Sequence, residues 1–252
     1  MLSSIINDEE DSSDKAISKY LLTNLNQMDL LTINEIVDEA YVSHSSVRRF
    51  CNRLGYKNFS ELKNSFSDIV FPSNLHLRKF DPVHLYRENI TAELTNIING
   101  INQMNDDQMI QNIVDSIHNH AEVSLMSANN TTSNLLKFQQ ELFYANKIVR
   151  IVNNNYEDRN LSEVLNQSDL TIIVSVSGVF AEGVNQVIKN HTLKKILVTA
   201  NRNPDFKAFY DEIYYLSEND IRSDALGLLG KYGTTYFFDL ISEHYIYKYK
   251  SI

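Results

Sequence analysis

The sequence contains few of the residues that interrupt regular structure or cross-link a chain. Its 252 residues include 7 glycines, 3 prolines and a single cysteine, Cys51. So few glycines and prolines favour long helices and strands over extended loops. One cysteine excludes a disulfide bond within the chain, as is usual for a cytosolic protein.

Long apolar segments are also absent. No apolar run approaches the ~18 residues that indicate a transmembrane helix. No charged region followed by an apolar stretch opens the chain, so we expect no signal peptide. The hydrophobic content of 43% is nevertheless that of a folded globular protein. We therefore expect a cytoplasmic protein without a membrane partner, and the length favours two domains.

Positive charge is scarce, since 23 lysines and arginines face 32 acidic residues and the formal net charge is −9. This balance argues against a nucleic-acid partner, because neutralised phosphates supply most non-specific affinity. The distribution of charge reverses the argument. Residues 1–43 carry nine acidic residues against two lysines, whereas residues 44–63 carry five basic residues against one glutamate. The positive charge is concentrated in one short segment.

That segment belongs to a pattern of two short helices joined by a tight turn, spanning residues 33–63. Thr32, followed three residues later by Glu35, predicts a capping box at the start of the first helix. Ser43 is predicted to cap the second helix. Four residues of the second helix stand at i, i+3, i+4 and i+7 and share one buried face: Val47, Phe50, Cys51 and Leu54.

The other face of the second helix carries the basic residues, as in a helix that inserts into DNA. An ordinary solvated face is the alternative interpretation of these arginines, and Arg49 could also brace the bundle by pairing with Glu39. Because this face lies on the second helix of the pattern in an otherwise acidic region, we predict DNA contacts. The predicted DNA-binding residues are Ser43, His44, Ser45, Ser46, Arg48, Arg49, Arg53 and Lys57.

From Ala121 onwards short β-rich runs alternate with helical segments. Runs at 122–128, 147–152, 169–176, 194–200 and 212–217 are predicted strands, and a long helix is predicted over 225–249. This alternation predicts an α/β domain with a doubly wound, parallel five-stranded sheet flanked by helices, after an all-α N-terminal bundle. We expect a helix-turn-helix domain at 1–71, a linker at 72–82 and the α/β domain at 83–252.

Two of the predicted strands are followed by unusually polar loops, SANNTTS at 127–133 and VSVSGVFAE at 174–182. In a doubly wound sheet, ligands bind beyond the carboxyl ends of the strands. Hydroxyl groups beside the free N–H groups of a helix start make an anion site, and phosphate is the natural candidate. The alternative, in which these serines only cap helices, stays open. The seven histidines show no metal-ligand spacing, so we predict neither a metal nor a cofactor.

These motifs resemble the two domains of the RpiR/MurR-type bacterial transcription regulators. The helix-turn-helix pattern of that family is matched by Val42-Ser43, Arg49-Phe50-Cys51 and Leu54-Gly55-Tyr56. The second polar loop is similar to the Ser-x-Ser-Gly-x-Thr-x-Glu signature of the family's SIS (sugar isomerase) domain. The resemblance covers nearly the whole chain. Together with the first loop it implies these ligand-binding residues: Ser127, Asn129, Thr131, Ser175, Ser177, Gly178 and Glu182.

The sequence departs from the family pattern at three positions of these loops. Phe180 stands where the signature has threonine, which removes a hydroxyl donor and places an aromatic ring beside the expected phosphate. Ser127 and Asn129 stand where glycines are usual, and their side chains crowd the approach to the backbone. Two alternatives follow: an SIS domain that senses a ligand, and one that only oligomerises.

The resemblance implies a DNA-binding regulator of genes for phosphosugar or amino-sugar metabolism, not an enzyme. Its partners would be a double-stranded DNA operator, a sugar-phosphate effector, and further copies of the chain in a homodimer or homotetramer. The rival interpretation is an SIS-type phosphosugar isomerase in which Glu182 acts as the catalytic base.

Overall fold

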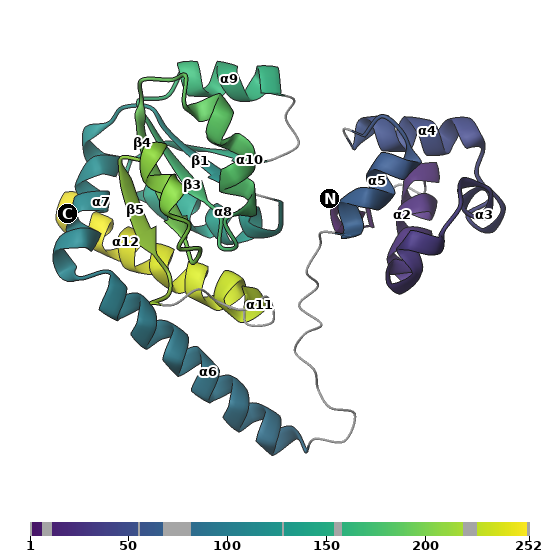
Figure 1. Ribbon diagram of the computed structural model, residues 1–252. Helices are drawn as coiled ribbons and strands as arrows, with labels where there is room; N and C mark the ends of the chain where they lie inside the picture. The colour runs from purple at the N-terminus through teal and green to yellow at the C-terminus, as the bar shows by residue number, and fades with distance from the viewer. Residues whose placement is uncertain are drawn as a thin grey trace. The chain divides into compact units, whose positions relative to one another are not determined.

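The computed structural model describes residues 2–6, 12–54, 56–67, 82–127, 129–153, 158–218 and 226–250. The chain divides into two compact units, residues 1–70 and 71–252, which are considered one at a time (Figure 1). Gly55 and residues 72–81 of the predicted linker lie outside the described residues.

The N-terminal unit is a bundle of short helices, as predicted. Its elements are α1 (Leu2–Ile6), α2 (Ser13–Thr23), the 3₁₀ helix η1 (Leu25–Leu30), α3 (Ile33–Glu39), α4 (His44–Arg53) and α5 (Phe59–Ser67). η1 was not predicted, since Met28 and Leu31, which it helps to bury, are too few to make a visible periodic pattern.

Local sequence signals position the two helices of the helix-turn-helix. Thr32 Oγ1 accepts a hydrogen bond from the Glu35 N–H at 3.3 Å, and Glu35 Oε2 accepts one from the Thr32 N–H at 2.7 Å. The predicted capping box is therefore confirmed at the start of α3. The predicted apolar face of α4 is also confirmed, because Val47, Phe50 and Cys51 are fully buried in the core of the bundle.

The C-terminal unit alternates strands and helices. Two helices precede the sheet, α6 (Val83–Met104) and α7 (Asp107–Asn119). The first half of the α/β region comprises β1 (Val123–Ser127), α8 (Asn129–Tyr144), β2 (Val149–Asn153), α9 (Asp158–Asn166) and β3 (Leu170–Val174). The second half comprises α10 (Val179–Ile188), β4 (Lys194–Thr199), the 3₁₀ helix η3 (Pro204–Ala208), β5 (Glu212–Tyr215), α11 (Leu226–Leu228), the π-helical turn η4 (Leu229–Gly233) and α12 (Thr234–Tyr249).

All five strands are parallel and lie in the order β2-β1-β3-β4-β5. This is the predicted doubly wound sheet. The order reverses between β1 and β3, where the crossover from β1 leads to one side and the crossover from β3 to the other. Ser127, at the end of β1, is the register partner of Val174, at the end of β3. The loops that follow these two strands therefore start side by side, at the position where ligands bind in such sheets.

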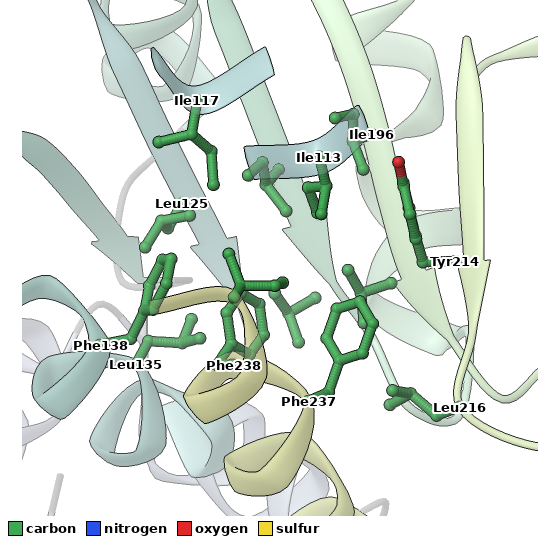
Figure 2. Packing of buried hydrophobic residues seen from close by; sticks show 14 of the residues in the cluster. Ile113, Ile117, Leu125, Leu135, Phe138, Ile196, Tyr214, Leu216, Phe237 and Phe238 are labelled. Carbon is green, nitrogen blue, oxygen red and sulfur yellow. The ribbon is translucent and has the colours of Figure 1, made fainter. Parts of the chain in front are cut away.

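Two apolar layers cover the sheet. On one face, α6, α7, α8 and α12 bury alternate strand residues such as Leu125 and Ile196 against Phe138, Phe237 and Phe238, as Figure 2 shows. On the other face, α9, α10 and η3 bury a smaller cluster that includes Met126, Ile173 and Leu197. Since the alternation of strand side chains supplies both layers, the sheet forms a rigid platform under its loops.

Candidate functional site

The turn between α3 and α4 is tight and ends in a serine cap. Tyr41 has a φ angle of 53°, in the left-handed region, and the Val42 N–H donates to the Val37 carbonyl at 3.1 Å. Ser43 Oγ then accepts a hydrogen bond from the Ser46 N–H at 3.1 Å and lies 2.9 Å from Ser46 Oγ. The hydroxyl of the buried Ser46 therefore takes part in the start of α4, as does that of Ser43.

Several of the predicted DNA-binding residues are exposed on one side of α4. Arg49 Nη2 donates to Ser46 Oγ at 3.4 Å, which holds its guanidinium near the start of the helix. The Lys57 backbone N–H binds Glu61 at the start of α5, and its side chain is exposed. The exposed residues of α4 in this set are His44, Ser45, Arg48, Arg49 and Arg53.

Arg53 has a structural partner that sequence spacing does not predict. Its Nη1 lies 2.6 Å from Asp14 Oδ2 of α2, and Asp14 is only 6% exposed. The bracing interaction considered for Arg49 and Glu39 is thus seen at Arg53. Because Asp14 and Arg53 are far apart in the sequence, only the folded bundle brings them together.

In the C-terminal unit, the two serines of the second polar loop have different environments. Ser175 is 4% exposed, and its Oγ accepts a hydrogen bond from the Ala181 N–H at 3.2 Å, so it caps the first turn of α10. Ser177 is exposed, and its Oγ accepts a long hydrogen bond from the Val179 N–H at 3.5 Å. Gly178 has a φ angle of 85°, which explains the glycine between Ser177 and the helix. Ser177 therefore offers its hydroxyl to a ligand more freely than Ser175.

The first polar loop contributes fewer described side chains. Ser127 is fully buried, and its Oγ lies 3.1 Å from Thr132 Oγ1 at the start of α8. Thr131 is half-buried. Ala128 and the side chain of Asn129 are outside the described part of the structure.

A third loop, after β4, contacts the second polar loop, and its residues are not among the predicted site residues. Asn201 Nδ2 donates to the Ser177 carbonyl at 2.8 Å, and Asn203 Nδ2 donates to Glu182 Oε1 at 3.1 Å. A Cβ atom at Gly178 would lie 2.5 Å from Asn201 Nδ2, so the two loops interlock. The Asn-Arg-Asn turn directly after a buried strand next to β3 is the sequence signal that could have identified this loop.

The position of Phe180 modifies the expectation for the phosphate loop. Its ring is half-buried and packs against the apolar cluster that α9 and α10 form on the sheet. Part of the Phe180 ring therefore contributes to the apolar core of the domain. The substitution removes a hydroxyl group, as the sequence predicts, while the neighbouring Ser177 stays exposed.

In the described part of the chain, no three histidine, cysteine or acidic residues group together in a way that could hold a metal ion. Among the helices described, none combines the length and the apolar character that crossing a membrane requires.

The chain joins a helix-turn-helix bundle, in which α4 is cationic, to a doubly wound α/β domain. This combination defines a class of proteins that join a nucleic-acid-binding module to a ligand-binding fold. Residues 3–70, nearly the whole N-terminal unit, match the helix-turn-helix domain of the rpiR family. The match begins in α1 and includes both helices of the motif.

Two curated proteins are similar in sequence. The uncharacterized HTH-type transcriptional regulator YfhH of Escherichia coli strain K12 is 28% identical over 121 residues, 45% of this chain and 43% of that protein. The HTH-type transcriptional regulator HexR of Pseudomonas aeruginosa is 21% identical over 175 residues, 68% of this chain and 61% of that protein. The chain thus spans about half the length of the curated relatives it matches.

The fold is shared with a solved protein structure. The Vibrio vulnificus NanR protein, complexed with ManNAc-6P, aligns over 98% of this chain and 90% of its own with a TM-score of 0.51 and 16% sequence identity. At this identity the similarity shows the fold alone. The predicted architecture, a helix-turn-helix bundle followed by a doubly wound α/β domain, is confirmed.

Proposed function

We propose that this protein is a DNA-binding transcription regulator whose SIS-type domain binds a sugar phosphate. The observation that carries the first part is the exposed cationic side of α4 within an rpiR-type helix-turn-helix domain. A recognition helix enters the major groove with its first residues against the base edges. His44 and Ser45 occupy that place here, while Arg48, Arg49 and Lys57 suit guanine edges or phosphates.

An acidic chain that binds DNA through one short helix gains little affinity from each copy. A homodimer would place two α4 helices on a roughly palindromic operator. Its half-sites would be spaced by about 34–36 Å, one turn of DNA, or a multiple of that distance. We propose this arrangement for the operator complex, with oligomerisation through the C-terminal half of the chain.

The DNA-binding proposal is tested with duplexes that the full-length protein selects from a random-sequence pool. Replacing Arg48 and Arg49 together by alanine should weaken binding at least about tenfold in an anisotropy titration. It should also lower the slope of log affinity against log salt, because fewer counterions are released. Arg87→Ala, which removes an exposed arginine from α6, is the matched control. Unchanged affinity of the double variant would contradict the assignment of α4.

The ligand site proposed for the SIS-type domain lies at the reversal of the sheet. Three loops converge there, since the β1 and β3 loops start on adjacent strands and the β4 loop is hydrogen-bonded to Ser177. Helix α10 begins at this edge, and the positive end of a helix dipole favours an anion. The proposed ligand residues are the predicted ones: Ser127, Asn129, Thr131, Ser175, Ser177, Gly178 and Glu182. A sugar phosphate supplies both the anion and the hydroxyl groups that these side chains can bind.

Thermal shift measurements test the ligand proposal, with ManNAc-6P and common hexose 6-phosphates as probes. A ligand at 100 times its Kd raises the stability of the folded state by about 2.7 kcal/mol. Ser177→Ala should abolish this increase without changing the melting temperature of the free protein. Ser175→Ala removes the cap of α10 and should cost about 1 kcal/mol even without a ligand. If no phosphosugar stabilises the protein, the domain only oligomerises.

We further propose that the protein does not turn over its ligand, as the names of its curated relatives indicate. The Glu182 carboxylate is exposed and accepts a hydrogen bond from Asn203, an arrangement that suits a bound sugar hydroxyl. An isomerase assay on the same hexose phosphates discriminates between the alternatives. Turnover that Glu182→Gln abolishes would establish the enzyme interpretation instead.

A further inference from the structure

Tyr41 occupies an unusual place in the helix-turn-helix. It lies in the turn between α3 and α4 with a φ angle of 53°, a left-handed conformation that costs little for glycine but is strained for an aromatic residue. Its side chain is 94% exposed. With so little of its surface covered, the ring gains no packing that could offset either the strained backbone or the exposed apolar surface.

The surroundings of Tyr41 place it at a boundary of charge. Two residues further along the chain, Ser43 caps α4, and His44 and Ser45 begin its exposed side. Consecutive Cα atoms are 3.8 Å apart, so the Cα atoms of Tyr41 and His44 are at most about 11 Å apart. On the other side, α3 ends with the exposed carboxylates of Asp38 and Glu39. Along the chain, Tyr41 therefore lies between the acidic end of α3 and the first residues of the face proposed for DNA.

We propose that Tyr41 is a DNA-backbone contact, with its phenol O–H donating to a phosphate oxygen beside the groove that α4 enters. This inference rests on the proposed function of α4. A tyrosine hydroxyl is one of the side-chain groups that bind DNA phosphates. At this boundary a neutral donor is better suited than an ammonium or guanidinium group, whose charge the neighbouring carboxylates would neutralise. The aromatic ring in this strained turn thus contributes to the DNA complex and not to the stability of the fold.

The test compares stability with DNA affinity in full-length variants. Tyr41→Gly should leave the melting temperature unchanged or raise it, because glycine adopts the left-handed conformation without strain. It should nevertheless weaken binding about fivefold per subunit, as expected for one hydrogen bond. Tyr41→Phe, which removes only the hydroxyl group, should weaken DNA binding by most of the same factor. The probes are the selected duplex and a scrambled duplex of equal length.

The pattern of losses distinguishes a phosphate contact from other roles. Both duplexes should be affected by the same factor, because a phosphate carries no sequence information. The salt slope should stay that of the unmodified protein, since phenol releases no counterion, whereas Arg48→Ala should lower it. Tyr41→Gly with unchanged affinity overturns the inference while leaving the function of α4 intact if Arg48→Ala still weakens binding. A wild-type chain that binds neither duplex overturns both.

Discussion

At the scale of single residues, the three arginines of α4 have different interactions although all are exposed on one side of the same helix. Arg48 is exposed, Arg49 is held by Ser46, and Arg53 forms an ion pair with a carboxylate of another helix. The difference arises from Asp14, which the fold buries beneath the end of α4. A buried carboxylate needs a partner, so Arg53 contributes to the stability of the bundle.

Arg53→Ala should therefore destabilise the N-terminal unit by about 1–3 kcal/mol, because Asp14 would remain buried without its charged partner. Arg48→Ala, five residues earlier on the same helix, should change the free energy of unfolding by less than about 0.5 kcal/mol. Urea denaturation followed by circular dichroism measures both. If Arg53→Ala and Arg48→Ala have equal stability, the ion pair contributes nothing. The double variant Asp14→Asn with Arg53→Ala should recover part of the loss.

At the scale of elements, the ends of α7 and α12 are joined by a polar cluster away from the proposed ligand loops. Lys248 Nζ and Tyr249 Oη each lie 2.6 Å from Asp115 Oδ1. The His118 ring stacks on the Tyr249 ring with 3.6 Å between centroids and an interplanar angle of 3°. The hydrogen bond from Lys248 lowers the pKa of Asp115, and the one from Tyr249 lowers it further. These contacts hold the last turn of α12 against α7.

A lowered folded-state pKa means that the folded protein prefers the ionised Asp115. Its stabilising effect is therefore complete above the unfolded-state pKa of about 3.9 and disappears as the pH falls through the lower folded-state value. Asp115→Asn should reduce the melting temperature at pH 7, and the difference from the wild type should shrink below about pH 4. Calorimetry across this range measures it, and Tyr249→Phe should give an intermediate loss. A difference that grows on acidification would contradict this account.

At the scale of the whole molecule, the succession of helices and strands along the chain follows from patterns that are local in the sequence. Alternating strands and helices predict the parallel sheet, and Thr32 with Glu35 predicts the start of α3, because each signal involves neighbouring residues. The interlocked β3 and β4 loops and the Arg53–Asp14 pair could not be predicted, since they join distant parts of the chain. The sequence predicts one continuous helix over 225–249, and the π-helical turn η4 within it could not be predicted for a similar reason. Its Gly230 carbonyl accepts a hydrogen bond from Asn134 of α8, a contact that exists only in the packed domain.

The placement of the candidate site was partly predictable for a related reason. In a doubly wound sheet, polar loops after successive strands converge only if the strand order brings those strands together, and Ser127 and Val174 are register partners. Which of the two serines is exposed was not predictable. Ser175 and Ser177 are two residues apart in the same motif, yet one caps α10 and the other is exposed. The difference depends on the path of the backbone at Gly178.

The buried position of Cys51 has a practical consequence for kinetic experiments on this protein. Cys51 is the one cysteine of the sequence, it is fully buried in α4, and burial raises the pKa of its thiol to about 11. At neutral pH a thiol reagent can therefore react only in molecules whose N-terminal unit has opened. The labelling rate of the intact chain reports the opening equilibrium of the DNA-binding unit alone, even while the α/β domain stays folded.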